Sequence, residues 1–171
     1  MKLITFFSAS INAAVLAAVV GFGAYHWNEA QAEQILGTVT EEQRHCLQQN
    51  IYWEARNQSD LGRQAVAWVT LNRVDSARYP DTVCDVVWQR KQFSWTHDGK
   101  SDEPGDNVLE QAAWREAGLV AERVLNQWAR GRDSVVGAAT HYHADYARPY
   151  WRTAYVQVAQ VDNHIFYEEK G

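Results

Sequence analysis

Hydrophobic residues recur along the chain with three different spacings, and each spacing predicts a different kind of element. Residues 3–25 form one apolar run that no charged residue interrupts. Between residues 40 and 130, apolar side chains return every three or four positions, which is typical of helices that pack one face against a core. After residue 139, apolar and polar positions alternate, as they do in strands. The pattern predicts a mainly helical α+β domain with a small antiparallel sheet.

The apolar run at residues 3–25 is long enough to cross a bilayer as a helix. Lys2 precedes it, and because the positive end of such a segment stays inside, the rest of the chain is expected outside the cytoplasmic membrane. Eleven of these 23 residues are Ala, Gly, Ser or Thr, which makes insertion only weakly favourable. A releasable anchor, a permanent anchor and a signal cleaved before Glu33 all stay open. We divide the chain into this segment (1–27), a linker (28–39) and a domain (40–171).

The first helix of the domain is predicted to begin at Thr40, because Gln43 follows it at the spacing of a capping box. Leu47, Ile51 and Glu54 then fall at positions i, i+4 and i+7, and so on one helix face. The leucine and isoleucine commit that face to the interior. The carboxyl group of Glu54 is therefore expected to be buried. Asn57 tolerates a positive φ and is predicted to end the helix.

The elements that follow are predicted from caps, turn residues and the change of spacing. They are a helix at 59–74, a short element at 82–89, an extended piece at 92–95, an exposed loop at 97–107, a helix at 107–130, and strands at 140–143, 155–161 and 164–168. Asp162 and Asn163 are predicted to form the hairpin turn between the last two strands.

The charge of the chain argues against nucleic acid as a partner. The net charge is −5, and no basic stripe is available to replace counterions along a phosphate backbone. Eight Trp and eight Tyr residues are many for a chain of 171, and their flat rings suit the faces of sugars as well as a protein core. Composition alone does not separate these two uses.

Cys46 and Cys84 are the two cysteines of the chain. Export to an oxidising compartment favours a disulfide between them, and two buried thiols are the alternative. A zinc site at these cysteines is not expected, because neither has the close spacing that zinc ligands show. We expect no metal and no other cofactor.

A carboxyl group on the buried face of a helix needs a physical reason to be there. Removal from water disfavours the ionised form and raises the pKa toward the range in which a carboxyl group serves as a general acid. Glu54 is therefore the candidate catalytic residue. The alternative is a buried ion pair with Arg56, Arg63 or Arg73, and the helical spacing does not decide between the two.

Seven short segments occur in a fixed order along the chain, and each is weak evidence alone. They are Cys46-Leu47-x-x-Asn50-Ile51-Tyr52-Trp53-Glu54-Ala55-Arg56, Gly62-x-x-Ala65-Val66-Ala67, Leu71-Asn72-Arg73-Val74, Tyr79-Pro80-Asp81-Thr82-Val83-Cys84, Gln92-Phe93-Ser94-Trp95, Ala139-Thr140-His141-Tyr142-His143-Ala144 and Asn163-His164-Ile165-Phe166-Tyr167. Together they resemble the SleB-type cell wall hydrolase family, known from spore-cortex-lytic enzymes. The apolar N-terminal run is similar to the signal anchors of some phage lytic enzymes, and we expect a phage or proteobacterial-like member.

The resemblance implies a lysozyme-like fold related to lytic transglycosylases, and cleavage of the β-1,4 bond between N-acetylmuramic acid and N-acetylglucosamine in peptidoglycan. The glutamate of the family's IY-x-EAR motif corresponds to Glu54. A lytic transglycosylase needs one protein carboxyl group, because the muramic 6-hydroxyl closes on C1, whereas a hydrolytic muramidase needs a second. Where Arg-Gly-Glu is frequent in the family, this chain has Arg56-Asn57-Gln58. Candidates for a second carboxylate, each expected at the surface, are Asp60, Asp75, Asp85 and Asp145.

The same resemblance places Gln92, Phe93 and Ser94 in the substrate cleft, where an amide, a ring and a hydroxyl group suit contacts with N-acetyl groups and sugars. Core packing is the alternative for the aromatic residues of this region. The other candidate substrate-binding residues are Trp95, Thr140, Tyr142, His143 and His164.

Two further functions stay open. His141 and His143 lie on one side of a predicted strand, so a metal-dependent wall amidase or peptidase with His164 as third ligand is one alternative. A tethered glycan-binding protein is the other. The leading hypothesis is an endolysin-like monomer on the periplasmic face of the cytoplasmic membrane, or released from it. Its partners would be peptidoglycan glycan strands and, through residues 3–25, that membrane.

Overall fold

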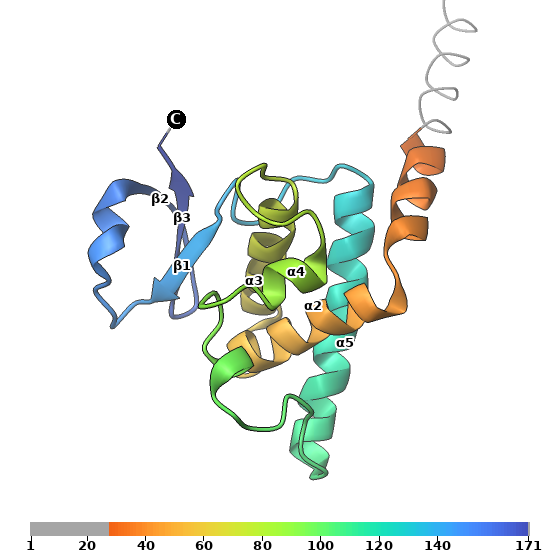
Figure 1. Cartoon of the computed structure of the whole chain (residues 1–171), viewed down its shortest axis with the longest axis horizontal. Helices are drawn as coiled ribbons and strands as arrows, with labels where there is room; N and C mark the ends of the chain where they lie inside the picture. Colours follow the sequence, from red (N-terminus) through yellow and green to blue (C-terminus); the bar gives the residue numbers. More distant parts are fainter. Residues whose placement is uncertain (1–27, 171) are drawn as a thin grey trace, which may run out of the picture.

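The computed structural model describes residues 28–170 and confirms the predicted fold class, a mainly helical α+β domain with a small antiparallel sheet (Figure 1). Its elements are α2 (Glu41–Ala55), α3 (Asp60–Val74), α4 (Val83–Val87), η1 (Trp95–His97), α5 (Val108–Ala129), β1 (His141–Ala144), η2 (Tyr150–Ala154), β2 (Tyr155–Val161) and β3 (His164–Glu169). The strands and η2 lie together at one side of the helices.

Residues 28–38 are helical, although the sequence predicts a linker there. Packing explains the difference, because Ala32 is fully buried and Glu29 forms an ion pair with Arg130 just after α5, at 3.3 Å. The predicted membrane segment at residues 3–25 lies outside the described residues. None of the helices within residues 28–170 combines the length and apolar character that crossing a membrane requires.

Helix α2 begins as predicted, with the hydroxyl oxygen of Thr40 accepting a hydrogen bond from the backbone N–H of Gln43. The reciprocal half of the capping box is replaced, because the Gln43 side chain accepts a hydrogen bond of 2.9 Å from the backbone N–H of Cys84. Cys84 also forms a disulfide with Cys46, 38 positions earlier in the chain. Helix α2 is therefore tied to the start of α4 by a hydrogen bond and a covalent bond.

The turn that ends α2 differs from the prediction. Among the described residues other than glycine, only Lys91 and Asp162 have a positive φ, so the left-handed conformation predicted for Asn57 is wrong. The chain instead leaves α2 with Arg56 in helical conformation and enters α3 at Ser59, whose hydroxyl oxygen caps the new helix. Helix α3 follows α2 after a very short connection.

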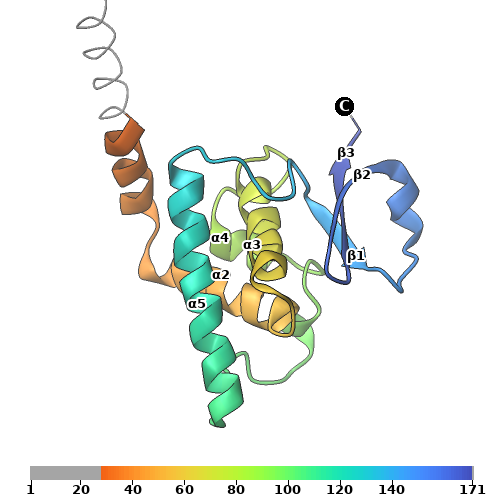
Figure 2. The same ribbon diagram turned by 180° about the vertical axis from the view of Figure 1, so that it is seen from behind.

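Helix α5 packs against both α2 and α3 and forms the back of the helical part (Figure 2). The face of α2 that the spacing of Leu47 and Ile51 predicts to be internal is internal, since both side chains are fully buried. Val120 and Val124 of α5 are fully buried as well and belong to the same core. Burial of these aliphatic side chains fixes the direction in which α2 presents its other residues.

The sheet has the strand order β1-β3-β2, and both pairs of neighbours are antiparallel. Asp162 stands in the predicted hairpin turn with a φ of 50°, which joins β2 to β3. Phe166 of the central strand is fully buried and part of the helical core. This contact fixes the sheet to the helices, and with it the neighbouring strand β1, in which Tyr142 pairs with Phe166.

Candidate active site

A cleft of about 500 Å³ is lined by four separate parts of the chain, namely α2, α3, the segment 91–97 and β1. Its lining residues are Glu54, Arg73, Lys91, Gln92, Phe93, Ser94, His97 and Tyr142. The fold thus brings the predicted catalyst together with four of the eight predicted substrate-binding residues.

The carboxyl group of Glu54 is bound by Tyr142, whose hydroxyl group donates a hydrogen bond of 2.9 Å to Oε2. Burial raises the pKa of Glu54, while the hydrogen bond from Tyr142 and the charge of Arg73 oppose the rise by favouring the carboxylate. The pKa is raised on balance. A carboxyl group in this setting keeps its proton to higher pH than an exposed one, as a general acid must.

Tyr142 is held as a neutral hydrogen-bond donor. Burial, together with the neighbouring carboxyl group of Glu54, raises the pKa of its hydroxyl group well above the usual value. Its ring is positioned by the rings of His164 and Phe166, with centroids at 5.2 and 5.6 Å. The donor that faces Glu54 therefore depends on packing within the sheet.

Arg73 places a buried positive charge beside the cleft. Its side chain is only 4% exposed, and its Nε donates a hydrogen bond of 2.8 Å to the carbonyl oxygen of Thr140. The guanidinium group lies over the rings of Tyr79 and Phe93, at 5.5 and 5.3 Å from their centroids. Its Nη1 has no hydrogen-bond partner in the described part of the chain. Arg73 is thus fixed by three neighbours, while its Nη1 keeps its N–H groups unpaired.

The alternative of a direct ion pair at Glu54 is not what the structure contains. None of the ion pairs between described residues includes Glu54. Arg56 lies instead over the rings of Tyr52 and Trp53, and Arg73 acts on Glu54 through its charge at a longer distance. The half-buried carboxyl group is therefore left available to a ligand.

The segment 91–97 supplies one wall of the cleft. The extended conformation predicted for residues 92–95 is wrong, because the chain turns there and enters η1. Lys91 has a φ of 70°, and the hydroxyl group of Thr96 closes the turn by donating to the carbonyl oxygen of Phe93 at 2.9 Å. The turn puts Gln92 and Ser94 at the cleft, while the ring of Phe93 is buried over Arg73.

Two of the predicted substrate-binding residues serve the core or another cavity. Trp95 is buried against Trp53 and Trp88, with ring centroids at 6.4 and 5.5 Å, as the core-packing alternative predicts. Thr140 lines a second cavity of about 910 Å³, which also contains Asp75. Both residues lie outside the cleft that contains Glu54.

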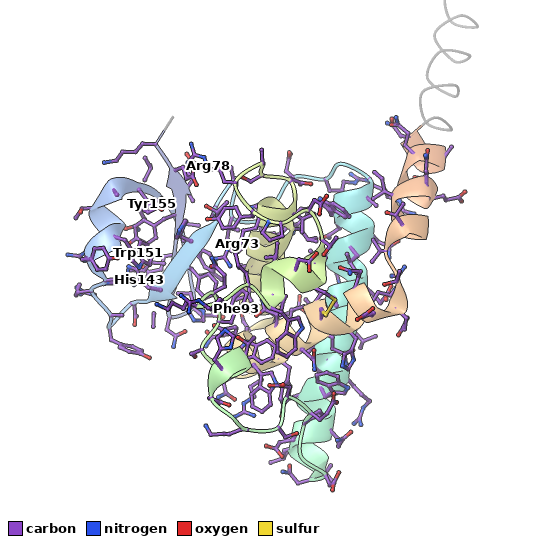
Figure 3. The ribbon with its side chains drawn as sticks, in the orientation of Figure 1. Arg73, Arg78, Phe93, His143, Trp151 and Tyr155 are labelled. Carbon is purple, nitrogen blue, oxygen red and sulfur yellow. A yellow bond between two sulfur atoms is a disulfide. The ribbon has the colours of Figure 1, made fainter. Side chains whose placement is uncertain are left out.

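The two predicted histidines also lie outside the cleft. His143 is buried, and its Nε2 is 3.0 Å from the hydroxyl oxygen of Tyr167. Figure 3 shows His143 and Tyr155 on the sheet with Trp151 of η2 beside them, and Arg73 with Phe93 between the sheet and the helices. The rings of His164 and Tyr142 pack nearly perpendicular to each other, so His164 touches the site through the tyrosine.

The histidines of β1 have partners of their own. The Nδ1 of His141 is 3.0 Å from the hydroxyl oxygen of Thr140, and burial lowers the pKa of His141 to about 4. Within residues 28–170, no group of three or more His, Cys, Asp or Glu side chains is placed to hold a metal ion. The His-x-His pattern is accounted for in this structure by packing and hydrogen bonds.

The candidates for a second carboxylate lie elsewhere. Asp60 pairs with Arg123 at the surface, Asp75 accepts a hydrogen bond from Trp128, and Asp85 accepts one from Thr82. Neither these three nor Asp145 lines the cleft. Among the described residues at the cleft, Glu54 is the one carboxyl group.

Three cleft residues are missing from the predicted site. Arg73 falls on the same face of α3 as the buried Val66 and Val69, so its position carries the signal that identifies Glu54 on α2. From the sequence, Arg73 was predicted only as a possible ion-pair partner of Glu54. Lys91 and His97 reach the cleft through the turn at 91–97, and no spacing pattern predicts that conformation.

The chain is similar to known cell wall hydrolases and spore cortex-lytic enzymes. Residues 57–167 match the model of the family described as Cell Wall Hydrolase. The spore cortex-lytic enzyme of Oceanobacillus iheyensis is 36% identical over 117 residues, which are 68% of this chain and 38% of that protein. The spore cortex-lytic enzyme of Bacillus subtilis is 29% identical over 141 residues, 82% of this chain and 42% of that protein. The chain thus spans less than half the length of these relatives.

Two solved structures share the fold. The catalytic domain of the germination-specific lytic transglycosylase SleB from Bacillus anthracis superposes with a TM-score of 0.61 at 27% identity, covering 75% of this chain and 96% of that one. The catalytic domain of the Bacillus cereus SleB protein gives a TM-score of 0.58 at 28% identity, covering 75% and 91%. Since 96% and 91% of the solved chains are covered, the similarity extends over nearly the whole of each catalytic domain.

Proposed function

Because the chain belongs to the Cell Wall Hydrolase family, we propose that it is a lytic transglycosylase that cleaves peptidoglycan between N-acetylmuramic acid and N-acetylglucosamine, with Glu54 as its single catalytic carboxyl group. The observation that carries the proposal is the hydrogen-bonded pair of Glu54 and Tyr142 in a cleft with no other carboxyl group among its lining residues. Similarity to the catalytic domain of a lytic transglycosylase supports the type of reaction. Glu54 lies just before the matched residues 57–167, so its role rests on the geometry and on the resemblance of its motif.

The proposed reaction has two steps that one carboxyl group performs. In the first, protonated Glu54 transfers its proton to the glycosidic oxygen while the bond from that oxygen to C1 breaks. In the second, the muramic 6-hydroxyl oxygen forms a bond to C1, and its proton returns to the Glu54 carboxylate. The product is a 1,6-anhydro sugar, no water is consumed, and the enzyme regains its starting protonation state.

The neighbours of Glu54 suit both steps. Burial favours the protonated form that the first step requires, and the hydroxyl group of Tyr142 and the charge of Arg73 stabilise the carboxylate that exists between the steps. The amide of Gln92 and the hydroxyl group of Ser94 lie at the same cleft and suit hydrogen bonds to N-acetyl and sugar hydroxyl groups.

Digestion of purified sacculi tests the function directly. We expect muropeptides that end in 1,6-anhydro-muramic acid, each lighter by one water molecule than the product of hydrolysis, as measured by mass spectrometry. A chelator is expected to leave the release of fragments unchanged. Reducing muramic ends would support the hydrolytic muramidase instead, free stem peptides with sensitivity to chelation would support the metal-dependent amidase or peptidase, and intact sacculi would support a glycan-binding protein.

Replacing Tyr142 with phenylalanine is expected to move the alkaline limb of the pH–activity profile to higher pH. The lost hydroxyl group stabilises the carboxylate of Glu54, so its removal raises the pKa of Glu54 further. Since a general acid works in its protonated form, activity declines as pH rises through that pKa, and a higher pKa moves the decline upward. We also expect kcat to fall by about tenfold, because a hydrogen bond to the charged intermediate form is lost.

The matched control for this variant is Tyr146→Phe, since Tyr146 follows β1 closely and is 82% exposed. Its profile should coincide with that of the wild-type protein. An alkaline limb that stays in place or moves down in the Tyr142 variant would contradict the role given to the hydroxyl group.

We place the enzyme on the outer side of the cytoplasmic membrane, where its substrate is. The support is the uncharged run of residues 3–25 with Lys2 before it. An endolysin-like role in lysis follows if the segment is released from the membrane. N-terminal sequencing of membrane and soluble fractions over time distinguishes release, cleavage and permanent anchoring.

A further inference from the structure

Lys91 has an unusual backbone conformation at the edge of the cleft. Its φ of 70° lies in the left-handed region, which costs free energy for a residue with a side chain. Its backbone N–H points to Nε2 of His97 at 3.4 Å, which is the only hydrogen bond that holds it within residues 28–170. A glycine would adopt this conformation without strain. A function of the lysine side chain would explain why a lysine stands here instead.

The side chain of Lys91 is exposed and lines the cleft. It takes part in none of the ion pairs between described residues. The nearest acidic residues along the chain have other partners, since Asp85 accepts a hydrogen bond from Thr82 and Asp98 is paired with Lys100 at 3.1 Å. The ammonium group of Lys91 is therefore available to a ligand in the cleft.

The cleft is positively charged in a chain whose net charge is −5. Lys91 stands at its rim, and the guanidinium group of Arg73 is buried in its wall. Glu54 is the one carboxyl group there, and burial raises its pKa, which disfavours its negative charge. Because Nη1 of Arg73 is inaccessible to solvent, Arg73 attracts a ligand through the electric field of its positive charge. The ammonium group of Lys91, in contrast, can contact the ligand directly.

We propose that Lys91 binds a carboxylate group of the substrate next to the bond that Glu54 cleaves, and that the fixed charge of Arg73 strengthens this binding. The proposal rests on the proposed function, since it names the part of the glycan strand that the cleft selects. A carboxylate fits because Lys91 can pair with it directly and the positive charge of Arg73 attracts it, so that two cations of the cleft face it against one carboxyl group.

Peptidoglycan offers this chemistry from two sources. One is the carboxylates of the stem peptides, and the other is the lactyl carboxylate of muramic acid after its peptide has been removed. The first predicts a preference for peptide-bearing strands, and the second a preference for bare strands. Both preferences are expected to disappear when the carboxylates are converted to amides.

The test measures binding separately from cleavage. The Glu54→Gln protein, with and without Lys91→Met, is sedimented with insoluble sacculi, and the fraction bound is followed against sacculus concentration. We expect Lys91→Met to weaken binding by about three- to tenfold, as for a partly exposed charge pair. Raising the salt concentration should weaken binding of the lysine protein and have little effect on the methionine protein.

Three substrates identify the carboxylate. They are untreated sacculi, sacculi whose carboxylates are amidated with carbodiimide and ammonia, and strands stripped of peptides by an amidase and immobilised on beads so that they sediment. The effect of Lys91→Met should vanish on the amidated material. It should persist on stripped strands if the lactyl group is bound, and vanish there if the stem peptide is bound.

Two control variants separate charge from other effects. Lys100→Met removes an exposed lysine of the same loop region outside the cleft and should bind like the parent. Lys91→Gly removes the charge and also the backbone strain, so it should bind as weakly as Lys91→Met while unfolding at a higher temperature.

The outcomes also separate this inference from the proposed function. Equal binding of the lysine and methionine proteins, or an equal loss on amidated sacculi, overturns the carboxylate site even if the wild-type protein releases anhydro-muropeptides. If the wild-type protein binds in a Lys91-dependent manner but releases no fragments, the carboxylate site stands and the lytic activity falls.

Discussion

Replacing Glu54 with glutamine is expected to lower the rate of glycan cleavage by about a thousandfold while the fold is retained. The amide is nearly the size of the carboxyl group and still accepts the hydrogen bond that Tyr142 donates at 2.9 Å. It has no proton to give to the glycosidic oxygen and cannot take one back from the muramic 6-hydroxyl, so both steps lose their catalyst. General acid–base catalysis contributes a factor of this size. The measurement is the release of anhydro-muropeptides from sacculi, together with the circular dichroism spectrum.

The same variant is expected to be at least as stable as the wild-type protein at neutral pH. Burial raises the folded-state pKa of Glu54, so its contribution to stability is present below the unfolded pKa and is lost as pH rises through the folded one. Glutamine does not ionise, so the Glu54→Gln protein does not lose stability in this way as the pH rises. Glu116→Gln, at an exposed position of α5, is the control and should change neither activity nor stability. Activity within tenfold of wild type in the Glu54 variant would refute the assignment of the catalyst.

Removing the disulfide by the double change Cys46→Ala and Cys84→Ala is expected to destabilise the domain by about 4 kcal/mol. The bond closes a loop across a sequence separation of 38, and a loop of that length gives a stabilisation of this size by the restriction it places on the unfolded chain. For a domain of this size, the loss corresponds to a melting temperature lower by about 10 °C. Thermal unfolding followed by circular dichroism measures it.

A reductant provides the control for this prediction. It should lower the melting temperature of the wild-type protein by a similar amount and leave that of the double variant unchanged. Equal melting temperatures for the oxidised wild-type protein and the double variant would mean that the hydrogen bond between Gln43 and Cys84 is sufficient to fasten α4 to α2.

Local signals in the sequence predicted the parts of the fold that local physics decides. Thr40 and Ser59 cap their helices because a hydroxyl oxygen satisfies backbone N–H groups that the helix itself leaves unpaired. The helical state of residues 28–38 was missed because it depends on the burial of Ala32 and on a pair with Arg130, far along the chain. Contacts of this kind leave no trace in the spacing of nearby residues.

The same distinction applies to the cleft. Glu54 was predicted from its position on the face of α2 that Leu47 commits to the core, and the resemblance of the later motifs suggested Tyr142. Lys91 was missed because a positive φ at a residue other than glycine is decided by the turn as a whole. Trp95 was placed in the site by its motif, although its ring packs against Trp53 and Trp88. A motif identifies a neighbourhood and does not say which side chains of it face the ligand.

The hydrogen bond between Glu54 and Tyr142 joins residues that are 88 positions apart in the chain. During synthesis, α2 with its glutamate leaves the ribosome long before β1, and β1 pairs with β3, which follows it in the chain. Under the proposed function, a chain that stops before β3 would contain Glu54 without the assembled pair of Glu54 and Tyr142, and we expect it to be inactive.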